Sequence, residues 1–143
     1  MVADVNSFSP STGKPEFVVE SWRGLGIPLA VQDVEPASNE LLCLAHNPDY
    51  VKRIFAGQEI NGFKNKRVDL AETCRYTVAG MRDAGMEALR NGRVAVAPVA
   101  GFHHARYAKS AGFCTFNGLI IAARALKNAG RVNSIGIVDC DFH

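Results

Sequence analysis

The chain has 143 residues, of which 48% are hydrophobic and 21% charged, and its formal net charge is +2. This length fits one domain, and this balance is typical of a globular chain rather than of a disordered one. The 16 Lys and Arg residues and the 14 Asp and Glu residues are too evenly matched to indicate nucleic-acid binding.

The four cysteines form no Cys-x-x-Cys pair and match no zinc-ribbon spacing, so we interpret them as reduced thiols of a cytoplasmic protein. The N-terminus lacks the apolar core of a signal peptide. The longest run without a formal charge, residues 110–123, is too short to span a bilayer. We therefore expect a cytoplasmic protein with neither a membrane nor a nucleic-acid partner.

Residues 1–14 are polar and turn-forming, and we interpret them as an N-terminal tail. Pro15 suits a first helical turn, so residues 16–23 are predicted to form a short helix that ends at Gly24. The apolar residues 17–19 within this segment also allow a strand.

Residues 27–34 alternate loosely between apolar and polar and predict a short strand. Ser38 can cap a short helix within residues 37–45. Asn47 can cap the next helix, predicted over residues 50–56.

The longest predicted helix covers residues 69–91, and Gly92 ends it. Asp69 with Glu72 three residues later resembles a capping box. Residues of one apolar face recur at helical spacing: Leu70, Cys74, Val78, Met81, Met86 and Leu89. Two internal glycines, Gly80 and Gly85, weaken this helix but would allow close packing.

The loop over residues 57–68 before this helix is long for a compact domain, and such loops often border functional sites. An ordinary connector is an equally good reading. Its basic residues, Lys64, Lys66 and Arg67, would touch substrate only at the rim of a site. We interpret them as part of a solvated loop.

Two short apolar runs, residues 94–99 and 134–139, are typical of strands buried on both faces, and a helix over 117–128 separates them. Helices and strands at this spacing predict an α/β fold with an open parallel sheet. Ligands of such sheets bind beyond the carboxyl ends of the strands. No Gly-x-Gly-x-x-Gly or Walker A pattern follows either strand, which disfavours a nucleotide site.

The second of these strands ends in Asp139, Asp141 and His143. Positions two apart in an extended segment face the same way, so an Asp141 oxygen and a His143 nitrogen can converge on one divalent cation. Such a donor set suits zinc, and also iron or manganese. Two ligands do not complete a catalytic zinc site, which usually takes three.

The first strand is followed by His103 and His104. One imidazole can act as a general base on a metal-bound water and the other as its acid or electrostatic partner. Asp139 is the expected partner of His103, fixing its tautomer. Each pattern alone is more often structural than functional, but their occurrence at two strand ends favours a metal site.

Three motifs in this order resemble the histone deacetylase superfamily, and in particular the class II-like bacterial histone deacetylase-like amidohydrolases. They are Gly101-Phe102-His103-His104-Ala105, Gly112-Phe113-Cys114-Thr115-Phe116-Asn117 and Asp139-Cys140-Asp141-Phe142-His143. The resemblance covers residues 15–143, which it implies are the N-terminal part of one arginase/deacetylase-like catalytic domain. The implied reaction is hydrolysis of an acetyl-amide, with acetylated lysine, a polyamine or a small acyl-amide as the substrate.

The resemblance also assigns roles to individual residues. Asp141 and His143 would be zinc ligands, and His103 and His104 would activate the zinc-bound water with Asp139 behind His103. Asp139 would also join a structural potassium site. Gly112 and Phe113 would line the substrate tunnel, with Cys114 near its floor. His46 would belong to a structural helix-cap motif.

Residues 1–93 contain no Asp or Tyr in a motif that matches the family's third zinc ligand or its oxyanion-stabilising tyrosine. We expect the chain to be a fragment of a full deacetylase. The alternatives are a truncated product without catalysis, or half of a split protein that pairs with another chain or with itself. In each case the two C-terminal strands would expose apolar surface, which favours homo-oligomers. Weak zinc affinity and negligible activity are then expected of the isolated chain.

Overall fold

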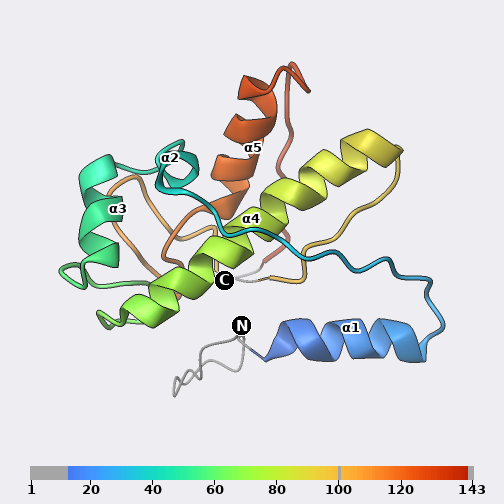
Figure 1. Cartoon of the computed structure of the whole chain (residues 1–143), viewed down its shortest axis with the longest axis horizontal. Coiled ribbons are helices and arrows are strands. Elements are labelled where there is room, and N and C mark those ends of the chain that lie inside the picture. The colour runs from blue at the N-terminus through green and yellow to red at the C-terminus, as the bar shows by residue number, and fades with distance from the viewer. Residues whose placement is uncertain (1–12, 100, 142–143) are drawn as a thin grey trace.

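The computed structural model describes residues 13–99 and 101–141. Within these residues the helices are α1 (Lys14–Gly24), α2 (Asn39–Leu42), α3 (Pro48–Phe55), α4 (Val68–Asn91) and α5 (Gly118–Asn128). Figure 1 shows α4 running through the molecule, with α5 crossing it, α2 and α3 near one end, and α1 set apart. None of these described helices has the length and apolar character needed to cross a bilayer.

Side-chain caps start three of the helices close to where the sequence predicts them. The Ser38 hydroxyl accepts a hydrogen bond from the backbone N–H of Leu41 at 3.3 Å. The Asn47 amide oxygen accepts from the backbone N–H of Asp49 at 2.8 Å. Asn117 does the same for α5, accepting from Ile120. Each cap satisfies an N–H group that the first helical turn leaves without a partner.

The predicted capping box at the start of α4 is wrong. The helix begins after Arg67, and no side chain caps it. Asp69 instead binds the Arg67 guanidinium, at 3.0 Å from Nε, and Glu72 binds Arg75 at 2.9 Å. Charge-assisted bonds to arginine are stronger than neutral hydrogen bonds, so both carboxylates are drawn away from the backbone. The other end is as predicted, because Gly92 ends the helix with a φ of 65°.

The predicted open parallel sheet is not formed by the described residues. Residues 27–34, 94–99 and 134–139 are extended but belong to no strand, and the only bridges described are two isolated ones within residues 106–114. A strand requires ladder hydrogen bonds to a neighbour, and these segments find none in the described part of the chain. Val94 and Val138 are each 87% exposed. This confirms the expectation of bare apolar surface there.

The core lies where α4 crosses α5 and where the 101–117 loop packs on α3. Gly85 of α4 allows the close crossing, because an added Cβ would lie 2.9 Å from the Leu126 side chain. Tyr50 is fully buried, and its hydroxyl donates to the Thr115 carbonyl at 2.8 Å. Phe116 packs edge-on against the Tyr50 ring, with the centroids 6.1 Å apart. The loop that carries the histidine pair is thereby fastened to α3.

The predicted apolar face of α4 is only partly buried. Leu70 and Val78 lie in the core, whereas Leu89 is 47% exposed. Residues 94–99, which follow α4, belong to no strand, so no sheet is formed among the described residues to cover the C-terminal turns of the helix.

His46 holds the same loop from the α2–α3 junction and is buried, as expected of a structural residue. Its Nδ1 lies 3.3 Å from the Tyr107 carbonyl, and its Nε2 accepts from the backbone N–H of Asn117 at 2.8 Å. An imidazole that donates at Nδ1 and accepts at Nε2 is neutral. Burial lowers the pKa of His46, which favours this neutral form.

Replacing His46 by Gln should reduce the pH dependence of stability between pH 7.5 and 5. Because the folded-state pKa of His46 is lowered, its contribution is complete above about pH 6.5 and is lost as the pH falls through the folded pKa. At pH 7.5 the variant should be about 1–3 kcal/mol less stable, because a buried hydrogen-bonding group loses its partner. Urea unfolding across this range measures both effects. An unchanged slope in the variant would contradict the role given to His46.

Gly118→Ala should destabilise the chain by about 1–3 kcal/mol, because it overpacks the core. The added Cβ would lie 2.4 Å from the ring of Phe102, which is itself buried. Gly136→Ala is the matched control, since nothing lies within 4 Å of its added Cβ. Urea unfolding should separate the two variants, and equal stabilities would show that the Phe102 ring moves aside without cost.

Candidate active site

His103 and Asp139 meet although 36 residues separate them. The Nδ1 of His103 lies 2.8 Å from Asp139 Oδ2, which confirms the expected pairing. With Nδ1–H donating to the carboxylate, the lone pair of Nε2 is directed to the other side of the ring. The backbone N–H of Asp141 and the His103 imidazole both lower the pKa of Asp139, which stays ionised as a hydrogen-bond acceptor.

Asp141 lies on the far side of the same imidazole. Its Oδ2 is 3.6 Å from Nε2 of His103, and its backbone N–H donates to Asp139 Oδ1 at 3.0 Å. A single turn of backbone therefore places one carboxylate at each nitrogen of the His103 ring. The predicted proximity of His103 to Asp141 is confirmed. His143, the other predicted metal ligand, lies outside the described residues.

His104 is packed against His103 and against a glycine. The two imidazole centroids are 4.1 Å apart, with the rings nearly perpendicular at 78°. A Cβ on Gly112, whose φ is 48°, would lie 2.3 Å from Cδ2 of His104. A Cβ on Gly101 would meet the Phe113 carbonyl oxygen at 2.8 Å. Both glycines are thus required for the histidine pair to rest against the 112–114 turn.

Phe113 and Cys114 complete this turn. Phe113 adopts a left-handed backbone with a φ of 60°. The residue is 42% exposed, so part of its side chain remains accessible at the surface. Cys114 is buried, and its Sγ contacts the Gly112 carbonyl at 3.2 Å. Burial raises the pKa of the Cys114 thiol, which keeps it protonated and unreactive.

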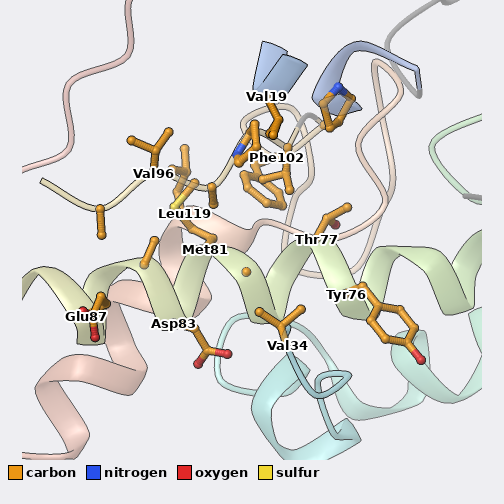
Figure 2. A pocket seen from close by; sticks show the side chains of 18 of the residues that line it. Val19, Val34, Tyr76, Thr77, Met81, Asp83, Glu87, Val96, Phe102 and Leu119 are labelled. Carbon is orange, nitrogen blue, oxygen red and sulfur yellow. The ribbon is translucent and has the colours of Figure 1, made fainter. Parts of the chain in front are cut away.

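An open groove joins these residues. Gly112, Phe113 and Cys114, the predicted substrate-lining residues, line it together with both histidines and with Asp139 and Asp141. Figure 2 shows its apolar walls, with Val19 of α1 on one side, Met81 and Thr77 of α4 on the other, and Phe102 and Leu119 between them. Such a mixture of apolar walls and a few convergent polar groups is typical of small-molecule sites.

The metal-binding capacity of the described residues is incomplete. A carboxylate beside an imidazole is a donor set that fits zinc in its chemistry. However, residues 13–99 and 101–141 contain no group of three His, Cys, Asp or Glu side chains that could hold a metal ion. Zinc ligation by Asp141 and His143 stays a prediction.

Sequence reasoning missed several aromatic residues of the groove, among them Phe63. Phe63, in the loop before α4, contacts Phe113 with the ring centroids 6.3 Å apart and lines the groove. A lone aromatic residue in a polar loop has no periodic neighbours that would mark it. The length of the 57–68 loop was the only signal, and it indicated a site border without identifying this residue.

Comparison with known proteins identifies the family. Residues 14–143 match the family described as histone deacetylase domain. The chain is 33% identical over 136 residues to polyamine deacetylase HDAC10 of Rattus norvegicus, an alignment that covers 85% of this chain and 23% of the relative. It is 30% identical over 125 residues to polyamine deacetylase HDAC10 of Danio rerio, covering 77% and 18%.

A solved structure, described as the crystal structure of the HDA15 HD domain, superposes with a TM-score of 0.72 at 17% identity. The superposition covers 91% of this chain and 40% of that one, and it supports a shared arginase/deacetylase fold. The chain thus spans less than a quarter of the two curated relatives and less than half of the solved domain. Since the family match extends over residues 14–143, this chain belongs to the histone deacetylase family.

Proposed function

We propose that this chain contributes to the site of a zinc-dependent amidohydrolase that removes acetyl groups from acyl-lysine or a related acyl-amine. The carrying observation is His103, held between Asp139 at 2.8 Å and Asp141 at 3.6 Å, with His104 against it. The names of its relatives support an acyl-amine substrate, since they include polyamine deacetylases and histone deacetylase 7 of Homo sapiens, which is 42% identical over 55 residues.

Asp141 and His143 would hold the zinc ion, together with a ligand from outside the described residues. When bound, zinc would supply Lewis acidity, which polarises the acyl carbonyl and makes water a better nucleophile near neutral pH. A potassium site that includes Asp139 stays a prediction.

The chain's own histidines would move the protons. His103 can accept a proton only at Nε2, because Nδ1–H is engaged by Asp139. Asp139 would stabilise the imidazolium that forms, as an ionised carboxylate beside a positive ring. His104 would be the second proton carrier and return a proton to the leaving amine. Water and the amide are thereby converted into acetate and a free amine.

Release of free amine from an acetyl-lysine peptide and from an acetylated polyamine tests this function. We expect negligible turnover from the chain with zinc alone, because the described residues provide no set of three ligands. Turnover should appear when the chain is joined to the part of rat HDAC10 that follows the matched region. In that joined protein His104→Ala should lower kcat/KM by about 10²–10⁴-fold.

Lys127→Ala, on the exposed surface of α5, is the control variant for this assay. Rapid turnover by the chain alone would contradict the inference that its site is incomplete. Full activity of the joined protein after His104→Ala would overturn the acid–base role.

Zinc affinity gives an independent measure of the site. A chelator-competition titration of the chain should give weak binding, on the order of micromolar or weaker, because fewer than three protein ligands are available. Asp141→Ala should weaken it further. Asp83→Ala, which removes a carboxylate from α4 that binds Arg82, should leave it unchanged. Nanomolar affinity, or no effect of Asp141→Ala, would contradict the ligand assignment.

Self-association without catalysis is a second candidate function, favoured by the exposed Val94 and Val138 on the unpaired extended segments. Apolar side chains beside unpaired backbone form a template for another strand. Light scattering after size-exclusion chromatography tests for self-association. A monomeric mass at all concentrations would exclude this second function.

A further inference from the structure

The sequence contains three Asn-Gly pairs, at residues 61–62, 91–92 and 117–118. Asparagine followed by glycine readily loses its side-chain amide, because glycine has no Cβ to keep its backbone nitrogen away from the preceding side chain. The rate of such an intramolecular attack depends on how closely and how freely the two reacting atoms can meet. The surroundings of each pair therefore decide which of the three can react.

Asn91 is the last residue of α4, and its side chain bonds to the peptide that follows it. Its Oδ1 accepts from the backbone N–H of Arg93 at 2.7 Å, and its Nδ2 donates to Glu87 Oε1 at 2.9 Å. The ring closed by the first bond contains both Cγ of Asn91 and the nitrogen of Gly92, so these two atoms lie close together. A donor at the carbonyl oxygen also stabilises the negative charge that develops there when a nucleophile attacks.

Asn61 has the same local geometry in a different setting. Its Oδ1 also accepts from the backbone N–H two residues further on, at 2.9 Å. However, Asn61 is 2% exposed, and the N–H of Gly62 donates to Oγ1 of buried Thr115 at 3.0 Å. An added Cβ on Gly62 would lie 2.5 Å from the carbonyl carbon of Cys114. The backbone of this pair thus has no room to rotate toward its asparagine.

Asn117 is held on both sides of its amide. Its Oδ1 caps α5 by accepting from the N–H of Ile120 at 3.1 Å, and its Nδ2 donates to the Ala105 carbonyl at 3.2 Å. Gly118 is buried, and an added Cβ there would lie 2.4 Å from the Phe102 ring. Reaction at this pair would require the cap of α5 and its packing to be lost together.

Gly92, by contrast, lies in the open. Residues 91–94 are exposed, and nothing lies within 4 Å of a Cβ added to Gly92. Its N–H donates to the Ala88 carbonyl at 2.9 Å, in the final turn of α4. Terminal helical turns fray at low free-energy cost, so this bond opens far more often than one in the core. The freed nitrogen can then turn onto Cγ of Asn91.

We propose that Asn91-Gly92 is a site of spontaneous deamidation and that the fold protects the other two pairs. The Gly92 nitrogen gives up its proton to solvent and bonds to Cγ of Asn91. The Cγ–Nδ2 bond breaks, and ammonia leaves with a proton taken from water. Water then opens the cyclic imide at either carbonyl, which leaves aspartate or isoaspartate at position 91. Nothing is oxidised or reduced, and neither zinc nor the histidine pair takes part.

The product places a negative charge where the fold accommodates it poorly. It lies at the C-terminal end of a helix, where the macrodipole disfavours anions. The hydrogen bond from Nδ2 of Asn91 to Glu87 becomes a contact between two carboxylates. Both residues line the groove together with Asp83, so the groove gains acidity at this end. We therefore expect the last turn of α4 to fray more in the deamidated chain.

The test is peptide mapping of the full chain by mass spectrometry, after incubation in mildly alkaline buffer with and without denaturing guanidinium chloride. In the folded chain Asn91 should be converted at least about tenfold faster than Asn61 or Asn117, because opening a helix end costs less than opening the core. In denaturant the three rates should fall within about threefold of one another, since each asparagine then precedes an unrestrained glycine. Labelling with an isoaspartyl methyltransferase should identify the isomerised peptide.

Two substitutions at the site separate the reaction from its consequence. Asn91→Gln keeps an amide but must close a larger, less favoured ring, so it should remove the fast reaction and leave the other two sites unchanged. Asn91→Asp imitates one product, and amide hydrogen exchange should be faster in the last turn of α4. Asn128→Asp, at the exposed C-terminal end of α5, is the matched charge control and should leave exchange in α4 unchanged.

Several results would overturn the proposal. They are equal conversion of the three asparagines in the folded chain, faster conversion of Asn61 or Asn117, and an intact Asn91 after an incubation that converts all three in denaturant. A fast reaction that persists in Asn91→Gln would do the same. None of these measurements requires turnover of an acyl-amine, so their outcome is independent of the deacetylase assay.

Discussion

The attachment of the 101–117 loop to α3 is the constraint on which the candidate site depends. The Tyr50 hydroxyl donates to the Thr115 carbonyl and His46 Nε2 accepts from the Asn117 N–H, so one hydrogen bond ties the loop to α3 and a second ties it to the segment just before α3. Hydrogen bonds of this kind are most effective where water is excluded, and both residues are buried. Neither residue touches the groove, yet together they decide where Phe113 and the histidine pair lie.

The second constraint is backbone crowding within that loop. Gly112 lies under the His104 ring, Gly101 lies against the Phe113 carbonyl, and Gly62 brings the neighbouring turn onto Cys114. Each approach leaves no room for a Cβ. Glycines at these positions therefore convert a flexible segment into a surface with a single arrangement, at the entropic cost that glycine carries in the unfolded chain.

Most local features of the fold could be predicted from the sequence, whereas the absence of pairing between the predicted strands could not. The caps at Ser38 and Asn47 follow from residues a few positions apart, and the structure confirms them. The prediction of a capping box at the start of α4 fails because Asp69 binds the Arg67 guanidinium instead of the backbone. The capping-box pattern takes no account of a neighbouring arginine. The prediction of a sheet fails because alternating and apolar sequence patterns favour extended backbone but do not specify which segment pairs with which. The contact of His103 with Asp139 succeeds because both residues follow extended segments whose ends were expected at one edge.

The unpaired segments explain why the site, although assembled, is weakly held on one side. The 101–117 side is buried and multiply bonded. By contrast, Asp139 lies at the end of an exposed segment. Val138 in this segment is 87% exposed and contributes little packing. The hydrogen bonds of its tip include the side-chain bond to His103 and the local bond within 139–141. Segments with few buried contacts open at low free-energy cost, so the carboxylate side would separate from the histidines before the core unfolds. Backbone pairing of residues 134–139 with a further strand would add ladder hydrogen bonds and bury Val138. Such pairing would hold Asp139 and Asp141 at the imidazole without changing a residue of the site.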